Sequence, residues 1–284
     1  MTRVIEIDSM AFSYGAKKVL GGVDLHVDPG EVVCLLGPNG VGKTTLLENI
    51  VGTLTPTAGR VRVFGQDPRR VKAGFWSRVG LVQQNWSDHP KWRVKDQLAW
   101  IGAIHETNRP AAISVEQALE LVSLGDKESQ KISSLSGGER RRLDFAAALI
   151  IGGPELLLLD EPTTGLDPVS KTQMHDVIMD RVDRSTTVLM TTHDLAEAEK
   201  LASRIIILGE GKVLANGSPM QLRSAHLGTA EVSWVADGVR NVHATEAPEE
   251  FLQGLPLDSI SELTVTRPTL EDAYLSIVKK NGEQ

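Results

Sequence analysis

Cysteine occurs once in this chain of 284 residues, as Cys34. A single thiol excludes an intramolecular disulfide framework and a zinc site built from several cysteines, and it is typical of a reducing compartment. Glycine and proline, with 26 and 13 residues, are too few and too scattered for a collagen-like or low-complexity chain. Apolar residues make up 41% of the sequence, so we expect a globular protein of one large domain or two smaller ones.

Long apolar runs are also missing. No run approaches the roughly 18 residues that a membrane-spanning helix requires, and the longest candidate ends at Pro154. The N-terminal segment carries Glu6 where a signal peptide would have its apolar stretch. The net charge of −7 disfavours broad binding to nucleic acid. We therefore expect a protein of the cytoplasm that reaches a membrane only through a partner.

The chain alternates apolar runs with helical patterns, which predicts an α/β fold with a parallel sheet flanked by helices. Alternating residues in 4–7 and 18–27 predict a small antiparallel sheet as well. Continuous apolar runs with the composition of fully buried strands occur at 32–36, 156–159, 187–190 and 205–208.

From about 86 to 150 the pattern is mostly helical, which predicts a helical insertion with helices at 95–104, 115–124 and 139–151. After Leu222 strand patterns return, and a helix is expected to begin at Thr269. We predict a main domain at 1–222, which includes the insertion, and a small α+β C-terminal appendage at 223–284.

A glycine-rich loop joins the strand at 32–36 to a helix expected from Thr44. Its sequence matches G-x-x-x-x-G-K-[ST], the pattern of phosphate-binding loops, in the strand–loop–helix context that the pattern needs. Backbone N–H groups of such a loop surround phosphate oxygens, Lys43 reaches the β- and γ-phosphates, and the Thr44 hydroxyl binds Mg²⁺. The residues expected to bind ATP in this loop are Gly37, Pro38, Asn39, Gly40, Val41, Gly42, Lys43, Thr44 and Thr45.

Two acidic residues follow the apolar run at 156–159. The first, Asp160, is expected to emerge near the phosphates and to hold Mg²⁺. The second, Glu161, can orient and deprotonate the attacking water. An apolar strand that ends in two acids is common, but here it accompanies a phosphate-binding loop.

A second glycine pair opens a helix in Leu135-Ser136-Gly137-Gly138-Glu139-Arg140. With this motif the chain resembles the ABC-type ATPases over most of residues 3–222. The resemblance implies that two cassettes pair head to tail. The signature loop of one chain, residues 136–139, then closes over ATP bound to Lys43 of the other.

Further positions resemble the family residue by residue. Tyr14 matches the aromatic residue that stacks on adenine, and Gln84 matches a glutamine that contacts Mg²⁺ and water. Asp167 matches the loop that couples the two sites, and His193 matches the histidine at the γ-phosphate. The resemblance therefore implies a metal site of Thr44, Gln84 and Asp160 and a catalytic pair of Glu161 and His193.

Two positions depart from the usual pattern. Gln83 stands where proline is usual, so either Gln83 or Gln84 can be the functional glutamine; the offset from Gly80 favours Gln84. Glu139 stands where glutamine is more common. Because Glu161 and His193 are both present, we expect hydrolysis of ATP rather than a regulatory module that only binds it.

Other signals have plainer interpretations. Cys34, inside a predicted strand, is expected to be a small buried hydrophobe. The run Arg140-Arg141-Arg142 is interpreted as a solvated or phosphate-facing helix side rather than a nucleic-acid patch. The histidines other than His193, among them His175, are assigned to the surface or to packing.

Four of the five tryptophans cluster around Gln84, at Trp76, Trp86, Trp92 and Trp100. They form either the core of the helical insertion or, as the resemblance implies, a groove for a helix of a membrane partner. In the second case Trp86 and Trp92 are exposed, with Lys91, Arg93 and Lys95 at the rim.

The function that we favour is that of the ATPase subunit of a membrane transporter. Its partners would be ATP, Mg²⁺, an integral-membrane permease on a separate chain and a second identical cassette, with no nucleic acid. It would bind at the cytoplasmic face of the membrane. The ending at 267–275 resembles the tail of cassettes in two-component exporters, which favours export. The alternatives are an importer ATPase and an ABC-type ATPase that acts on ribosomes or DNA.

Overall fold

The computed structural model describes residues 3–84, 88–106, 113–225, 230–267 and 269–282. The chain divides into two compact units, Met1–Val213 and Leu214–Gln284. The division falls inside strand β9 (Lys212–Gly217), whereas the predicted domain boundary follows Leu222. Each unit is described by itself.

The first unit is built on a central sheet. Its strands are β3 (Val32–Leu36), β5 (Val79–Val82), β6 (Leu156–Asp160), β7 (Thr187–Thr192), β8 (Arg204–Gly209) and β9, in the order β5-β6-β7-β3-β8-β9. β3 pairs in parallel with β7 and β8, and β6 pairs in parallel with β5 and β7. Every residue of β3, β6 and β7 is buried. The prediction of a buried parallel sheet is therefore confirmed.

A second sheet is antiparallel, with the strand order β2-β1-β4. Its strands are β1 (Ile5–Tyr14), β2 (Lys17–Val27) and β4 (Ala58–Val63). Their buried side chains share one hydrophobic core with β3 and with helix α1 (Lys43–Ile50). This packing holds the start of α1, and with it the glycine-rich loop, against two sheets.

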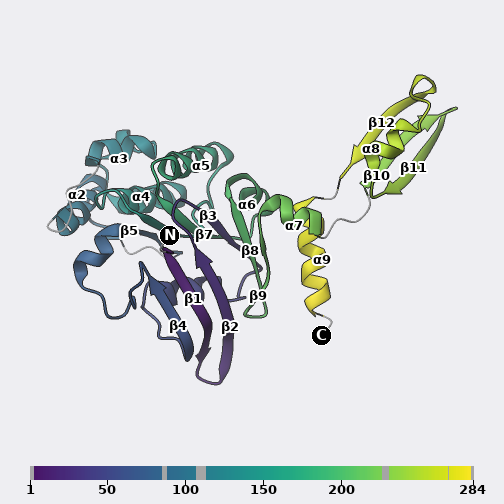
Figure 1. Ribbon diagram of the computed structural model, residues 1–284. Helices are drawn as coiled ribbons and strands as arrows, with labels where there is room; N and C mark the ends of the chain where they lie inside the picture. Colours follow the sequence, from purple (N-terminus) through teal and green to yellow (C-terminus); the bar gives the residue numbers. More distant parts are fainter. Residues whose placement is uncertain (1–2, 85–87, 107–112, 226–229, 268, 283–284) are drawn as a thin grey trace. The chain divides into compact units, whose positions relative to one another are not determined.

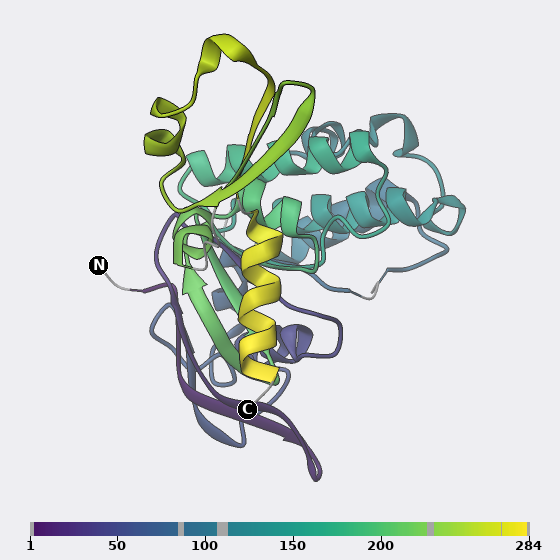
Figure 2. The same cartoon turned by 90° about the vertical axis from the view of Figure 1, so that its right-hand side faces the viewer.

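Three helices form the predicted insertion. They are α2 (Val94–Glu106), α3 (Val115–Leu121) and α4 (Gly137–Leu149), and α4 packs on β5. In Figure 1 they lie at the upper left of this unit, away from β1, β2 and β4, and Figure 2 separates the two groups again. Between β5 and β6 the described residues form no strand longer than one bridge, between Arg93 and Lys131.

Helices α5 (Pro168–Asp183) and α6 (Leu195–Leu201) complete the first unit, and α6 contacts β3 and β7. Within the second unit, α7 (Pro219–Ala225) packs on α9 (Leu270–Gly282). Helix α8 (Pro248–Gln253) packs on β10 of a sheet with the order β11-β10-β12. The strands of this sheet are β10 (Ala230–Ala236), β11 (Val239–Thr245) and β12 (Ile260–Thr266).

Three boundaries differ from the sequence prediction for identifiable reasons. β1 continues to Tyr14 through a register shift beside Ser9, which has a φ of 46°. The helix expected at 115–124 ends at Leu121, ahead of Ser123 with a φ of 55°. The helix expected from Glu139 begins at Gly137, because Ser136 caps it. The start predicted at Thr269 is confirmed, since its hydroxyl accepts a hydrogen bond from Asp272 N at 3.2 Å.

One carboxyl group in α4 links stability to pH. Burial raises the pKa of Asp144 to about 7, Asp88 acts in the same direction, and Arg141 and Arg140 oppose the shift. A carboxyl whose folded pKa lies above the unfolded value of 3.8 contributes stability at low pH. That contribution is lost as the pH rises through the folded pKa.

We therefore expect the Asp144→Asn variant, which keeps the shape and removes the titration, to gain thermal stability over the parent as the pH rises from about 5 to about 8. Melting temperatures at both pH values test this, with the exposed Asp183→Asn of α5 as the matched control. An equal difference between variant and parent at both pH values would contradict the expectation.

Candidate functional site

The glycine-rich loop runs from the end of β3 to the start of α1. Gly42 caps the helix with a φ of 108°, in the left-handed region that a side chain rarely adopts. A Cβ on Gly42 would also lie 2.7 Å from the Leu20 side chain. Glycine is therefore required here, and the free N–H groups at the start of α1 remain available to an anion.

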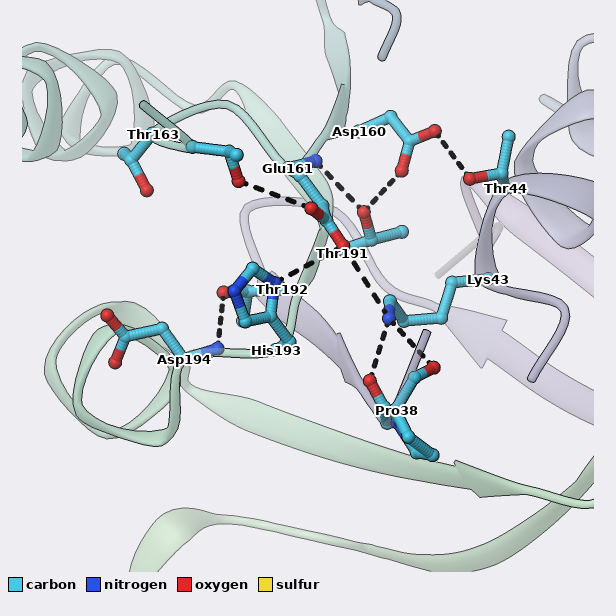
Figure 3. A network of polar contacts seen from close by, with 12 residues as sticks. Pro38, Lys43, Thr44, Asp160, Glu161, Thr163, Thr191, Thr192, His193 and Asp194 are labelled. Carbon is cyan, nitrogen blue, oxygen red and sulfur yellow. Dashed lines mark hydrogen bonds and ion pairs between the residues drawn. The ribbon is translucent and has the colours of Figure 1, made fainter. Parts of the chain in front are cut away.

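Lys43, the first residue of α1, is almost completely buried, with 5% of its surface exposed. Its Nζ donates hydrogen bonds to the carbonyl oxygens of Gly37 at 2.7 Å and Pro38 at 3.2 Å. The same atom lies 3.6 Å from Glu161 Oε1 (Figure 3). Burial lowers the pKa of Lys43, and Glu161 and Asp160 oppose that shift. The ammonium group is thus held inside the loop by oxygen atoms.

Asp160, at the end of β6, connects three elements of the site. One carboxylate oxygen accepts a hydrogen bond from the Thr44 hydroxyl of α1 at 2.8 Å. The other accepts a hydrogen bond from the Thr191 hydroxyl of β7 at 2.5 Å (Figure 3). Hydrogen bonds to an ionised carboxylate are about twice as strong as neutral ones. Asp160 therefore fixes the glycine-rich loop relative to two strands of the sheet.

Glu161 has a left-handed backbone, with a φ of 49°. Its N–H donates a hydrogen bond to the Thr191 hydroxyl at 3.0 Å. One carboxylate oxygen accepts a hydrogen bond from the Thr164 hydroxyl at 3.2 Å, and the other lies 3.4 Å from His193 Nδ1. His193 itself is about half exposed, with 52% of its side chain accessible. The buried carboxylate of Glu161 thus lies between Lys43 and the accessible His193.

A hollow of about 360 Å³ lies beside Lys43, and Glu161 lines it whereas His193 does not. The residues that line it are Tyr14, Lys17, Val19, Asn39, Gly40, Gly42, Lys43, Thr44, Thr45, Gln84 and Glu161. Gln84 belongs to this lining and Gln83 does not, but both line the smaller hollow beside it, so the choice of Gln84 stays a prediction. Tyr14 is half exposed at the rim, where its hydroxyl donates to Glu48 at 3.3 Å.

The donor set fits Mg²⁺. The Thr44 hydroxyl, the Asp160 carboxylate and the Gln84 side chain surround a smaller hollow next to the first, and all can offer oxygen atoms. Mg²⁺ prefers oxygen ligands and is typically held by one or two protein carboxylates or hydroxyls together with substrate phosphates. The predicted metal residues are therefore brought together by the fold.

The signature loop occupies a different place. Ser136 caps α4 by accepting a hydrogen bond from Glu139 N at 3.2 Å, and Ser136 N donates to the Glu139 carboxylate at 2.8 Å. Lys127 lies 3.7 Å from the same carboxylate. Among the described residues around Lys43, none of the four from Ser136 to Glu139 lines the hollow.

Asp167 caps α5. Its carboxylate accepts hydrogen bonds from the N–H groups of Val169 and Ser170 at 3.0 Å each and from the Ser170 hydroxyl at 2.6 Å. These bonds, that from the hydroxyl first, lower the pKa of Asp167. The contacts account for a structural role, and the predicted coupling role stays a prediction.

A buried glutamate that the sequence analysis missed supports the site from behind. Glu197 of α6 is 2% exposed and accepts hydrogen bonds from the Thr163 and Thr192 hydroxyls, both at 2.6 Å. His175 Nε2 lies 2.9 Å from it, so His175 is more than a packing residue. Burial acts to raise the pKa of Glu197, but the hydrogen bonds from His175, Thr163 and Thr192 bring it below its ordinary value. The segments that carry Glu161 and His193 are thus joined through one carboxylate.

The interpretation of the arginine run as a solvated or phosphate-facing side is wrong. Arg141 is 4% exposed, and each hydrogen bond described for its side chain goes to a backbone carbonyl group. Arg140 lies 3.0 Å from Asp88. Arg142 donates to the carbonyl oxygens of Val122 and Ser123 at 2.9 and 3.0 Å. Successive residues of a helix point in different directions, so the three side chains have separate partners. Arg141 and Arg142 donate to backbone carbonyl groups, and Arg140 pairs with the Asp88 carboxylate.

The tryptophans separate into two groups. Trp76 lines an apolar hollow of about 370 Å³ between β5, α2 and α4. Trp92 stacks on His89 at 4.3 Å between ring centroids and meets the exposed Trp100 edge to face. Trp86 lies outside the described residues. Trp92 is half-buried rather than exposed as predicted, and it does not line this hollow. Its predicted place in a groove stays a prediction.

The remaining minor expectation is confirmed. Cys34 is fully buried in β3, and burial raises the pKa of its thiol. No helix among the described residues has both the length and the apolar character to cross a bilayer.

The fold and site define a phosphate-binding-loop nucleoside triphosphatase. The features that define it are a buried parallel strand, a glycine-rich loop, a helix that starts at a lysine and a neighbouring strand that ends in an acid. The match to known families is more specific. Residues 20–164 match the family described as ABC transporter. The chain therefore belongs to the ATP-binding subunits of ABC transporters, which hydrolyse ATP.

Named relatives agree. The chain is 39% identical over 226 residues to the Nod factor export ATP-binding protein I of Paraburkholderia xenovorans (strain LB400), covering 79% of this chain and 74% of that protein. It is 41% identical over 221 residues to the daunorubicin resistance ATP-binding protein DrrA3 of Streptomyces coeruleorubidus, covering 78% and 70%.

Solved structures show the same fold. An ATP-binding subunit of an ABC transporter aligns with a TM-score of 0.72 at 21% identity, over 96% of this chain and 99% of that one. A nucleotide-free ATP-binding cassette from an ABC transporter aligns with a TM-score of 0.65 at 23% identity, over 76% and 91%. The predicted fold class and family are confirmed.

Thr191 allows a sharp test of the hydrogen-bond network. We expect Thr191→Val, which keeps the volume and removes the hydroxyl, to lower ATP turnover about 10- to 100-fold, because Asp160 and Glu161 both lose their hydrogen bond with the Thr191 hydroxyl. The matched control is Thr187→Val at the other end of β7, whose hydroxyl accepts from Gly30 N at 3.0 Å. Both variants lose a buried hydrogen bond, so both should melt lower; turnover that falls equally in both would contradict a specific role for Thr191.

Proposed function

We propose that this chain is the ATPase subunit of a membrane exporter and that hydrolysis occurs at Glu161. The observation that carries the proposal is the position of the Glu161 carboxylate, 3.6 Å from Lys43 Nζ and 3.4 Å from His193 Nδ1. A carboxylate held between a phosphate-binding lysine and an accessible histidine can take a proton from a water molecule next to the γ-phosphate.

The chain's residues divide the work of hydrolysis. The N–H groups of the glycine-rich loop and Lys43 bind the β- and γ-phosphates, and Tyr14 stacks on the adenine. Glu161 accepts the proton of the attacking water, and His193 stabilises the charge that develops on the γ-phosphate. Thr44, Gln84 and Asp160 would hold Mg²⁺, which neutralises phosphate charge when it is bound.

Two cassettes are needed for a complete site. In this proposal Ser136, Gly137 and Gly138 of one chain, together with Glu139, close over the ATP held at Lys43 of a second copy. The start of α4, with its unpaired N–H groups, suits the γ-phosphate. The separation of the signature loop from the hollow around Lys43 supports a homodimer with two composite sites, in which Asp167 couples one site to the other.

The membrane component is proposed to be an integral-membrane permease on a separate chain. The apolar hollow lined by Trp76, Val79, Ile101 and Ile151 supports docking of an apolar helix face there. Gln84, close to this region and to the metal residues, would transmit the movement of the permease. The cassette would then sit at the cytoplasmic face of the membrane. The names of the Nod factor export and daunorubicin resistance relatives support export.

Replacement of Glu161 tests the assignment of the base. We expect Glu161→Gln to lose ATP turnover by about 10²- to 10⁴-fold while it still binds ATP, because the amide keeps the shape but takes no proton. Turnover and nucleotide affinity are measured separately on the full chain. Lys43→Ala is the opposite control and should weaken ATP binding itself. Undiminished turnover in Glu161→Gln would contradict the assignment.

The signature loop is tested by dimer formation with ATP. A Cβ on Gly138 would come no closer than 3.4 Å to any neighbour, so Gly138→Ala fits the isolated chain. In the Glu161→Gln background we expect saturating ATP to produce a dimer on size-exclusion chromatography and Gly138→Ala to weaken it, because the added methyl group stands against the partner's phosphate. Gly125→Ala, with open space around it, is the matched control. A dimer unaffected by Gly138→Ala would contradict the composite site.

A further inference from the structure

Arg141 donates hydrogen bonds to the backbone around the proposed catalytic acid. Its guanidinium donates hydrogen bonds to the carbonyl oxygens of Asp160, Glu161 at 2.6 Å and Pro162 at 3.2 Å, and another to that of Gln83. One side chain of α4 therefore contacts three successive carbonyl groups at the end of β6. It also contacts the residue next to Gln84.

Three successive carbonyl groups rarely face one donor, because in an extended strand they alternate in direction. The left-handed backbone of Glu161, with a φ of 49°, breaks that alternation. This conformation is sterically unfavourable for a residue other than glycine. The hydrogen bonds from Arg141 on one side and the bond between Glu161 N and Thr191 on the other offset this cost.

Arginine suits this place and lysine does not. The guanidinium presents five N–H donors in a fixed plane, whereas an ammonium group has three donors around a single atom. Arg141 is 4% exposed, so each donor without an acceptor would remain unsatisfied in the interior. The four carbonyl groups are bonded through three different nitrogen atoms, Nε, Nη1 and Nη2, whereas lysine would offer a single nitrogen with three donors.

We propose that Arg141 is a positioning residue for ATP hydrolysis: it holds the left-handed turn that aims the Glu161 carboxylate, and it ties that turn to the Gln83 segment. The inference rests on the proposed role of Glu161 as the base. A shift of the Gln83 backbone, of the kind that a docking partner would cause, then reaches Glu161 through one guanidinium group.

Loss of Arg141 is expected to lower ATP turnover without weakening ATP binding. None of the four acceptors belongs to the glycine-rich loop, and the contacts of Lys43 with Gly37 and Pro38 do not involve Arg141. Loss of Arg141 should therefore change the aim of Glu161 and leave the phosphate-binding groups in place. A residue that merely supports the fold would instead affect binding and turnover together.

The test compares Arg141→Gln and Arg141→Lys with the parent in the full chain. We expect kcat for ATP to fall about 10- to 100-fold in Arg141→Gln, with the affinity for a fluorescent ATP analogue changed less than about threefold. Arg141→Lys, which keeps the charge and loses the planar set of donors, should restore little of the loss. Parallel loss of affinity and kcat in Arg141→Gln, or full activity in either variant, would overturn the proposal.

Two controls keep the outcomes distinct. Arg142→Gln removes another carbonyl-bonded arginine of the same helix, so it should lower the melting temperature without the specific loss of kcat. If Arg141→Gln does not fold, Arg141→Lys alone decides, and full activity there overturns the proposal. Glu161→Gln is assayed alongside: if that variant keeps its turnover, the proposed base is wrong, whereas loss in Glu161→Gln with full activity in Arg141→Gln rejects only the role of Arg141.

Discussion

The site depends on one carboxylate that accepts hydrogen bonds from two hydroxyl groups on different elements. The Asp160 carboxylate, at the end of β6, accepts hydrogen bonds from the Thr44 hydroxyl of α1 and the Thr191 hydroxyl of β7. These three elements carry the phosphate-binding loop, the proposed catalytic acid Glu161 and His193. Because β3, β6 and β7 are adjacent in a parallel sheet, their carboxyl ends meet at one edge, and only there can such a carboxylate reach both partners.

Two further side chains, Glu197 and Arg141, hold the segments around Asp160 in place. Glu197, behind the sheet edge, joins the Thr163 and Thr192 hydroxyls, and Arg141 holds the turn at Glu161 from the side of α4. Both supports are charged and almost completely buried, which is tolerable only because their partners satisfy them. The geometry of the accessible site is therefore set by side chains that never face the solvent.

The motifs of the site could be predicted from the sequence because their spacing is local. The loop from Gly37 to Thr44 and the acids after β6 occupy fixed positions next to apolar runs, and the parallel sheet followed from those runs. Arg141 and Glu197 could not be predicted, since their hydrogen-bond partners are 19 to 58 and 5 to 34 residues away and nothing in the helical patterns marks them. Thr191 carried a signal, because it and Thr192 are adjacent hydroxyl residues at the end of a fully buried strand. The edge strand β4 escaped detection because most of its residues are exposed.

In the proposed mechanism a second copy of the chain completes the site. An experimental structure of the Glu161→Gln protein with ATP and Mg²⁺ tests this directly. We expect two chains related by a two-fold axis, with Gly137 and Gly138 of each at the γ-phosphate held by Lys43 of the other. A structure in which the γ-phosphate contacts residues of one chain only, with the signature loops turned away, would contradict it.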